Sequence, residues 1–253
     1  MIPLKEQEFL RQKFAQELGG SVRIEFFTQR ETGLYLPGQE PCQYCKPTRQ
    51  ILEELAGLSG KIDLRTYYLS DHPAEAEEYG IDKAPAIVIR ARSGRWFTYY
   101  GLPTGNEFPA LIDALIVASH GGDALDAQTK KELKRIKQAV YLQVFVTPAC
   151  PYCPQMAHTV YALALESQHV RAEVVEISEF PQLAQRYQVK AVPTTVIDEK
   201  VMVPGAIPAR SLIEAVIKVA EGALVTEAGA AGAITPSDQT PGGRIGPAGL
   251  IIP

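Results

Sequence analysis

Residues 140–153 read Val-Tyr-Leu-Gln-Val-Phe-Val-Thr-Pro-Ala-Cys-Pro-Tyr-Cys, an apolar run that leads directly into a C-x-x-C motif. The apolar run at its start predicts a strand, and apolar side chains recur at helical spacing after Cys153. The sequence therefore predicts Cys150 at the N-terminus of a helix, where free N–H groups and the helix dipole favour a thiolate. Such a position can lower the pKa of a thiol from about 8.5 to roughly 3.5–7.5. The stretch thus predicts dithiol–disulfide exchange.

The same arrangement occurs once more, 108 residues earlier, as Cys42-Gln-Tyr-Cys45. Each leading cysteine precedes a proline by 43 residues, which pairs Cys42 with Pro85 and Cys150 with Pro193. The tyrosine, valine and isoleucine around the two prolines coincide without a gap. An internal duplication explains this agreement better than chance does.

Each half has the element order βαβα followed by ββα, which predicts an α/β fold with a mixed central sheet flanked by helices. A proline that opens a central strand removes a donor from the sheet, so we predict cis bonds before Pro85 and Pro193. The predicted domains are residues 1–120, residues 121–222, and a tail at 223–253 that is rich in Gly, Ala and Pro and is expected to be flexible.

The composition indicates a globular protein. The chain has 253 residues, of which 46% are hydrophobic and 21% charged, so a packed core is expected. A net charge of −4 gives no support to nucleic-acid binding. The start of the chain lacks the apolar core of a signal peptide, and no run approaches the roughly 18 apolar residues of a membrane span. We therefore expect a cytoplasmic protein that binds neither nucleic acid nor membrane.

All four cysteines fall in the two C-x-x-C pairs, and none is left for a structural disulfide. In a cytoplasmic protein, C-x-x-C near a βαβ pattern indicates a redox-active pair. The alternative is a zinc- or cluster-binding protein that uses both pairs as ligands. However, 104 residues separate the pairs, whereas zinc ribbons use about 15–20. We predict redox centres and no metal site.

The pattern of strand, C-x-x-C at a helix start and cis-proline about 40 residues later resembles the thioredoxin superfamily. Cys-Pro-Tyr-Cys at 150–153 is the glutaredoxin form of the motif, and Val192-Pro193-Thr194 is a typical cis-proline sequence. The duplication resembles the glutaredoxin-like protein disulfide oxidoreductases of thermophilic bacteria and archaea over residues 5–220. The resemblance implies two tandem thioredoxin-like folds and an activity that reduces, forms or isomerises protein disulfides.

The resemblance also implies roles for individual residues. Cys42 or Cys150 would attack a substrate disulfide, and Cys45 or Cys153 would resolve the mixed disulfide. No bound cofactor is implied beyond the redox-active disulfides, and electrons would come from a thioredoxin-reductase-type flavoprotein. The expected partners are therefore this flavoprotein and proteins that carry disulfides or dithiols. The residues implied to bind an extended substrate peptide are Ala84, Pro85, Val192 and Pro193.

A second enzyme role stays open, that of a reductant module for a peroxiredoxin. The tandem-fold N-terminal part of bacterial peroxiredoxin reductases plays this role. As a family, that module keeps one C-x-x-C motif, so two intact motifs count against it.

Glu25 lies on the strand that leads into the first motif. Aligning Thr28 with Thr147 places Glu25 opposite Val144. In thioredoxins and disulfide isomerases a buried acid in this strand helps move a proton at the resolving cysteine, so Glu25 is a possible proton acceptor. A hydrogen-bonded or exposed strand glutamate is the alternative. An ionised carboxylate there would raise the thiol pKa of the first pair, so we expect the second motif to carry most of the reductase activity.

Overall fold

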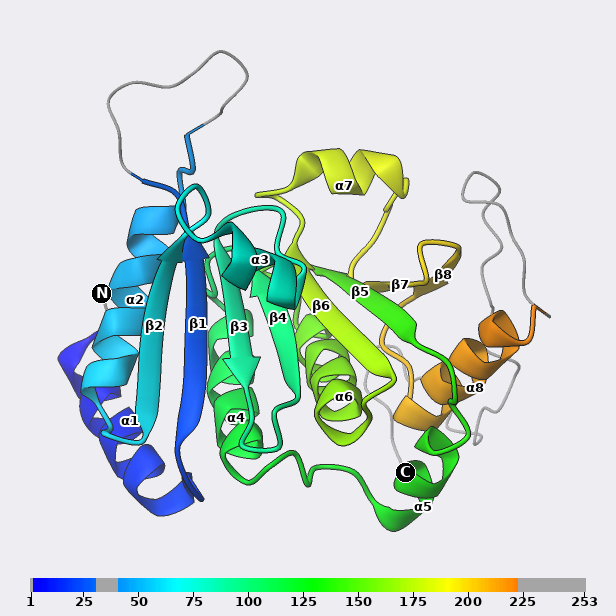
Figure 1. Ribbon diagram of the computed structural model, residues 1–253, viewed down its shortest axis with the longest axis horizontal. Coiled ribbons are helices and arrows are strands. Elements are labelled where there is room, and N and C mark those ends of the chain that lie inside the picture. Colours follow the sequence, from blue (N-terminus) through cyan, green and yellow to red (C-terminus); the bar gives the residue numbers. More distant parts are fainter. Residues whose placement is uncertain (1, 31–40, 223–253) are drawn as a thin grey trace, which may run out of the picture.

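A computed structural model describes residues 2–30 and 41–222 (Figure 1). The tail at 223–253, predicted to be flexible, lies outside the described residues, as does most of the loop before Cys42. The first half contains α1 (Leu4–Glu17), β1 (Val22–Thr28), α2 (Cys45–Gly57), β2 (Ile62–Tyr68), α3 (Pro73–Tyr79), β3 (Ala86–Arg90), β4 (Trp96–Tyr100) and α4 (Glu107–Ser119). The second half contains α5 (Ala127–Leu133), β5 (Val140–Val146), α6 (Cys153–Glu166), β6 (Val170–Glu176), α7 (Pro181–Arg186), β7 (Thr194–Ile197), β8 (Val201–Pro204) and α8 (Ala209–Ala220).

The strands form one mixed sheet in the order β2-β1-β3-β4-β6-β5-β7-β8. Each half contributes the same pattern, with a parallel first pair and an antiparallel hairpin, which confirms the predicted fold class. The sheet crosses from one half to the other because β4 pairs in parallel with β6, with Tyr99 opposite Val174. No pattern within either half predicts this junction, which makes the two central sheets continuous.

The helices divide between the two faces of the sheet. One apolar core lies under α1, α2, α4, α6 and α8 and contains Leu52, Leu111 and Leu163. The other core contains Tyr79 of α3 and Phe180, which precedes α7. In Figure 1, α3 lies in front of the sheet, whereas α4 and α6 lie behind it and pack against each other. The last helix of the first half therefore lies against the motif helix of the second.

Most helices and strands begin and end within one or two residues of the bounds that their apolar patterns indicate. Helix α5 is the main difference, because it ends at Leu133 although its polar pattern predicts a helix over 126–138. Asp126 caps its first turn by accepting hydrogen bonds from the backbone of Gln128 and Thr129. At the other end, the N–H of Ile136 donates to the carbonyl of Leu133, an i→i+3 bond that tightens the chain into a turn.

Two turns contain residues with positive φ. Gly121 and Gly122, at the predicted boundary, both have positive φ, and a Cβ on Gly122 would lie 2.8 Å from the Cβ of Leu165. Asp198 and Glu199 also have positive φ and connect β7 to β8, as expected for residues of a tight hairpin.

Among the helices in the described part of the chain, none has the length and apolar character that a membrane span requires.

Candidate active site

Disulfides join Cys42 to Cys45 and Cys150 to Cys153. Helices α2 and α6 begin at the second cysteine of each motif, so the leading cysteines lie in the turn just before the helix. Cys150 therefore precedes the helix, whereas the sequence predicted it as the first helical residue. The N-cap position belongs to Tyr44 and Tyr152. The first residue of α6 directs its free N–H group back toward the leading sulfur atom of the second centre.

The second redox centre shows this arrangement directly. The backbone N–H of Cys153 donates to Sγ of Cys150 at 3.1 Å. The same Sγ lies 3.7 Å from the carbonyl oxygen of Val192, and the Val192–Pro193 bond is cis, as predicted. An N–H donor stabilises a thiolate, and a nearby carbonyl can accept the proton of the thiol form. The centre can hold the leading sulfur in either protonation state.

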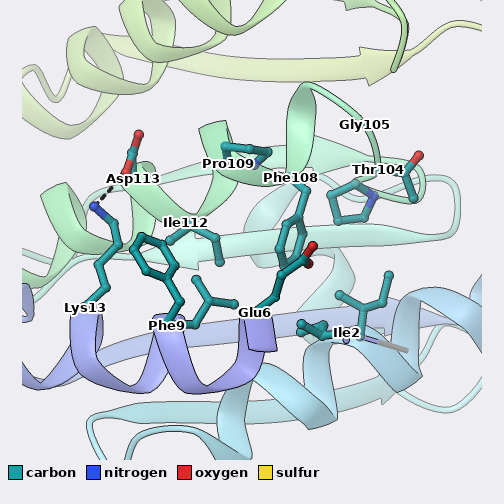
Figure 2. Close-up of a pocket in the computed structure, with 13 residues that line it drawn as sticks. Ile2, Glu6, Phe9, Lys13, Thr104, Gly105, Phe108, Pro109, Ile112 and Asp113 are labelled. Atoms are coloured by element: carbon teal, nitrogen blue, oxygen red, sulfur yellow. Dashed lines mark ion pairs between the residues drawn. The ribbon is translucent and has the colours of Figure 1, made fainter. Parts of the chain in front are cut away.

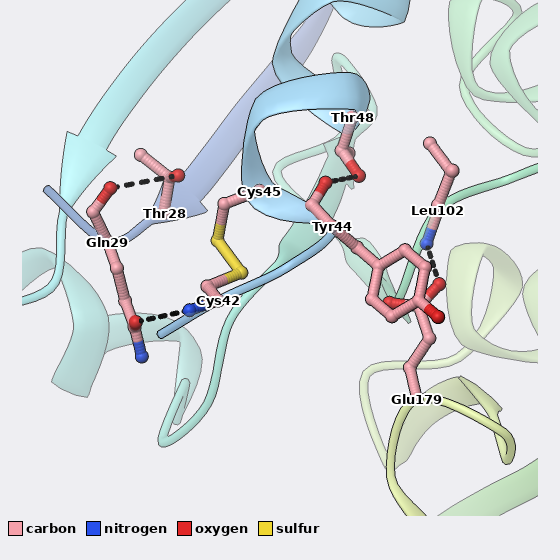
Figure 3. The surroundings of a disulfide bond; sticks show 8 residues. All are labelled: Thr28, Gln29, Cys42, Tyr44, Cys45, Thr48, Leu102 and Glu179. Carbon is pink, nitrogen blue, oxygen red and sulfur yellow. Dashed lines mark hydrogen bonds between the residues drawn. A yellow bond between two sulfur atoms is a disulfide. The ribbon is translucent and has the colours of Figure 1, made fainter. Parts of the chain in front are cut away.

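Figure 3 shows the surroundings of the first disulfide. The backbone N–H of Cys42 donates to Oε1 of Gln29 at 3.0 Å, and the hydroxyl of Thr48 donates to the carbonyl of Tyr44 at 2.7 Å. The second half of the chain supplies Glu179 to these surroundings. The Ala84–Pro85 bond is cis, as predicted.

Exposure differs within each pair as expected for an attacking and a resolving cysteine. Cys42 is partly exposed, whereas Cys45 is 2% exposed. In the second pair, Cys150 is 8% exposed and Cys153 is fully buried. In each pair the leading cysteine is therefore the more exposed of the two.

Both centres lie at the same edge of the sheet. Strands β1 and β5 point in the same direction and each leads into a motif, with β3, β4 and β6 between them. Neighbouring strands are about 4.8 Å apart, so the two strand ends are about 19 Å apart. Zinc–sulfur bonds are about 2.3 Å long. The alternative of one zinc ion bound by all four cysteines is therefore wrong.

The alignment that placed Glu25 opposite Val144 is wrong by one residue. Glu25 pairs with Val88 of β3, and the corresponding position of the second half, Val196 of β7, pairs with Gln143. Glu25 is therefore the counterpart of Gln143. A shift of one residue moves a side chain to the other face of a sheet. The insertion between Thr28 and Cys42 concealed this shift from the sequence alignment.

Glu25 lies on the α3 face of the sheet and has a partner there. The hydroxyl of Tyr79 donates to Oε1 of Glu25 at 2.9 Å, and Arg23 lies 3.8 Å from the same oxygen. Burial and this carboxylate raise the pKa of Tyr79 to about 12. The contacts of Glu25 thus support the alternative of a buried, hydrogen-bonded strand glutamate, and we do not carry its proton-acceptor role further.

Glu107 is a buried acid that the sequence analysis missed. It begins α4 and is 1% exposed, and neither carboxylate oxygen has a hydrogen-bond partner within the described structure. Burial, and then the charge of Glu176, raises the pKa of Glu107 to about 7. The preceding residue, Asn106, donates from its backbone and its side chain to the carbonyl of Pro148 at 3.0 and 3.2 Å. Glu107 therefore starts its helix beside the approach to Cys150.

The only sequence signal of Glu107 is that it is an acid at the start of an amphipathic run, which is common at helix N-termini. Its burial arises because α4 packs against α6 of the other half. A pattern read within one half does not contain this contact.

A pocket of about 610 Å³ lies between α1 and α4, on the same face of the sheet as the motif helices (Figure 2). Phe9 and Phe108 line it, and the ion pair of Lys13 with Asp113 at 3.4 Å lies at its margin. Gly105, which also lines the pocket, packs against the Pro148 carbonyl in front of the second centre. The sequence analysis did not predict this pocket.

Fold and cysteine pairs together define the class, a thioredoxin-fold protein with two disulfide redox centres. The thioredoxin domain family Thioredoxin_3 matches residues 140–218. The thioredoxin of Methanocaldococcus jannaschii is 38% identical over 80 residues, which are 94% of its length and 31% of this chain. The chain belongs to the thioredoxin family.

Another curated relative matches more of the chain. The F component of alkyl hydroperoxide reductase from Pseudomonas aeruginosa is 24% identical over 178 residues, which cover 70% of this chain and 32% of that protein. This chain thus spans about a third of that curated relative.

Two solved structures share the architecture. The NTD_N/C domain of alkylhydroperoxide reductase AhpF from Enterococcus faecalis is 27% identical, with a TM-score of 0.75, and the match covers 85% of this chain and all of that one. A protein disulfide oxidoreductase from Aeropyrum pernix has the same fold, with a TM-score of 0.78 at 24% identity, covering 90% of this chain and 97% of that one. In class, the chain is a thiol–disulfide oxidoreductase.

Proposed function

We propose that the chain is a protein-disulfide oxidoreductase that uses both C-x-x-C pairs on polypeptide substrates. The observation that carries the proposal is the position of Sγ of Cys150, between the N–H of Cys153 and the carbonyl of Val192. The first contact favours the attacking thiolate. The second places the backbone before a cis-proline beside the sulfur that the substrate must reach.

The reaction begins when the Cys150 thiolate attacks one sulfur of a substrate disulfide. A mixed disulfide forms, and the other substrate sulfur leaves as a thiolate that takes up a proton. Cys153 then loses its proton and attacks Sγ of Cys150, which releases the second substrate thiolate. The substrate gains two electrons and two protons, and the enzyme pair becomes a disulfide. Cys42 and Cys45 perform the same steps at the first centre, and the reverse sequence forms substrate disulfides.

Glu107 is the group that we assign as proton acceptor of Cys153. It lies at the start of the helix beside the Cys150 approach loop, and it has no competing partner among the described residues. A carboxyl with a pKa of about 7 can take a proton and return it at neutral pH.

The substrate peptide is proposed to lie in extended form along the two cis-proline loops. Ala84 and Val192 would offer their backbone groups, and Pro85 and Pro193 would shape the loops. Tyr44 and Tyr152 are 37% and 67% exposed at the mouths of the two sites. Main-chain hydrogen bonds give such binding affinity with little dependence on side-chain sequence.

The remaining expectations are proposals of the same kind. Reduction of the disulfides would come from a thioredoxin-reductase-type flavoprotein, without a bound cofactor in this chain. Proteins with disulfides or dithiols would be the substrates, and the cytoplasm the location.

A trapping experiment tests the proposal. Cys153→Ser leaves the mixed disulfide unresolved, so reduced Cys153→Ser should form a covalent adduct with insulin on a non-reducing gel. The background is Cys42→Ser with Cys45→Ser, which silences the first centre. Cys150→Ser in the same background is the matched control and should form no adduct. An adduct with the control alone would overturn the assignment of the attacking residue.

A second candidate is a reductant module for a peroxiredoxin. It is favoured by the 27% identity with the AhpF domain, all of which is covered. The reduced chain would then transfer electrons to a purified peroxiredoxin disulfide much faster than to insulin. A ratio of the two rates near one, or in favour of insulin, supports the broader activity.

A further inference from the structure

Three carboxylates gather where the two halves of the sheet meet. Glu107 begins α4, Glu176 ends β6, and Glu179 follows three residues later. Strands β4 and β6 are neighbours, and both end between the two redox centres. The cluster therefore lies on the edge that separates the two disulfides.

Glu176 occupies the centre of this cluster. It is 2% exposed, and its two oxygens accept hydrogen bonds from the backbone N–H groups of Ser178 at 3.2 Å and Glu179 at 2.9 Å. Two backbone donors stabilise a charged carboxylate in a buried position. The same bonds fix its position in the turn that follows β6.

Gly101 at the end of β4 allows the close approach of the two halves. Its φ is +118°, and a Cβ there would lie 2.8 Å from the Cβ of Glu176 and 3.2 Å from Cδ of Glu179. Only glycine fits both this backbone conformation and this spacing. The next residue, Leu102, donates its N–H to Oε1 of Glu179 at 2.7 Å.

The two outer carboxyls each have oxygens without a partner. Both oxygens of Glu107 and Oε2 of Glu179 are buried and accept no hydrogen bond within the described residues. Buried polar atoms without partners are rare and call for a physical explanation. A protonated carboxyl next to a fixed negative charge explains both positions, because two adjacent buried carboxylates repel each other.

We propose that Glu176 is a positioning residue for both redox centres: its fixed buried charge strengthens Glu107, beside the second centre, and Glu179, near the first, as proton acceptors. The proposal rests on the proposed function, in which Glu107 accepts the proton of Cys153. It adds a shared electrostatic control that links the two centres through the junction of the halves.

The directions of the pKa shifts at Glu107 and Glu179 agree with this geometry. Burial, with the nearby charge of Glu176 as a smaller cause, raises the pKa of Glu107 and of Glu179 to about 7. The N–H of Leu102 acts in the opposite direction on Glu179. Among the described residues, the titratable groups that interact with Glu107 include Tyr99 of β4 and Tyr161 of α6, whose pKa values burial raises well above the usual range. They stay neutral near pH 7, so Glu176 is the charge that acts on Glu107.

The test is a carboxyl titration of the oxidised full chain by ¹³C NMR, with signals assigned by Glu107→Gln and Glu179→Gln. In the oxidised protein the cysteines do not titrate. Glu176→Gln keeps the shape and removes the charge, so the ionisation constants of Glu107 and Glu179 should rise about threefold or more. Glu176→Asp is the matched control that keeps the charge, and it should retain most of the wild-type behaviour.

Unchanged titrations of Glu107 and Glu179 in Glu176→Gln, or equal changes in Glu176→Asp, would overturn the proposal. The wild type gives a second readout that needs no variant of Glu176. In the wild type, the Cδ signal of Glu176 should respond over the pH range in which Glu107 titrates. If it does not respond, the proposal is also overturned. These titrations do not depend on activity. Failure of the proposed function would appear separately, as absence of the insulin adduct.

Discussion

At the residue scale, Glu107 and Glu25 differ in what satisfies their charge. Both are buried, but the hydroxyl of Tyr79 donates to Glu25, whereas Glu107 has no hydrogen-bond partner among the described residues. A sequence contains the acids but not their partners. For this reason Glu25, which lies on a recognisable strand, attracted the functional hypothesis, and Glu107 did not.

Glu107→Gln removes the proposed proton acceptor and keeps the size of the side chain. Wild-type turnover of the second centre should rise with pH through about 7, because Glu107 must be ionised to accept a proton. The variant should lose this rise and be slower by roughly tenfold or more at pH 8. The measurement is the pH profile of insulin reduction in the Cys42→Ser, Cys45→Ser background. A variant profile that superposes on that of the parent would contradict the role.

Stability should also depend on Glu107. Its pKa is raised in the folded state from 4.5 to about 7, so the folded protein binds a proton that the unfolded chain releases. The stabilisation is full below about pH 4.5 and is lost as the pH rises to about 7. We expect Glu107→Gln to reduce this decline in the free energy of unfolding by on the order of 2 kcal/mol. Urea unfolding at pH 4.5 and pH 8 measures this decline in the wild type and in Glu107→Gln. An equal decline in the two proteins would be the contrary result.

At the element scale, the strands and helices follow from local patterns, but strand register does not. The apolar runs and helical spacing predict the elements closely, and the prolines at equal distance from each motif predict both cis bonds. The register of β1 can be assigned only from its pairing with β3. The insertion before Cys42 changes the distance from β1 to the first motif, so the two halves cannot be aligned there by spacing. One residue of error moved Glu25 to the wrong face.

Tyr79→Phe tests the corrected position of Glu25. Loss of the hydroxyl leaves a buried carboxylate without its donor, so the free energy of unfolding should fall by about 1–3 kcal/mol. Insulin reduction below the unfolding transition should stay within about twofold of wild type, since neither residue faces a motif. A large loss of activity in a fully folded variant would return Glu25 to the mechanism.

The exposure of the cysteines at the starts of the two motif helices predicts the order in which they react. Cys42 is partly exposed and Cys150 is 8% exposed, while Cys45 and Cys153 are 2% and 0% exposed. Iodoacetamide added to the reduced protein should therefore label the leading cysteines first, by roughly tenfold or more. Peptide mass spectrometry after short exposure measures this, and preferential labelling of Cys45 or Cys153 would speak against it.

At the scale of the whole molecule, the duplication was visible in the sequence but the junction was not. Equal spacings predicted two similar halves, and each half has the same strand order. Nothing in either half predicts that β4 and β6 pair, or that α4 packs against α6, because these contacts join residues of different halves. The buried carboxylates lie at this junction, which is why they escaped the sequence analysis.

A continuous sheet should unfold as one unit. Trp96, the single tryptophan, lies on β4 next to the junction, so its fluorescence reports the centre of the sheet. We expect fluorescence and far-ultraviolet circular dichroism to give coincident unfolding curves in guanidinium. Two separated transitions would show that the halves are independent.

We propose that both pairs exchange disulfides and that the second carries most of the activity. Glu25 no longer supports this order, but Glu107 beside the second centre does. The direct measurement is insulin reduction with dithiothreitol by wild type, Cys42→Ser and Cys150→Ser at equal concentration. We predict that Cys150→Ser loses most of the activity, Cys42→Ser loses less, and the double variant has none above background. A larger loss in Cys42→Ser, or full activity in the double variant, would contradict the account.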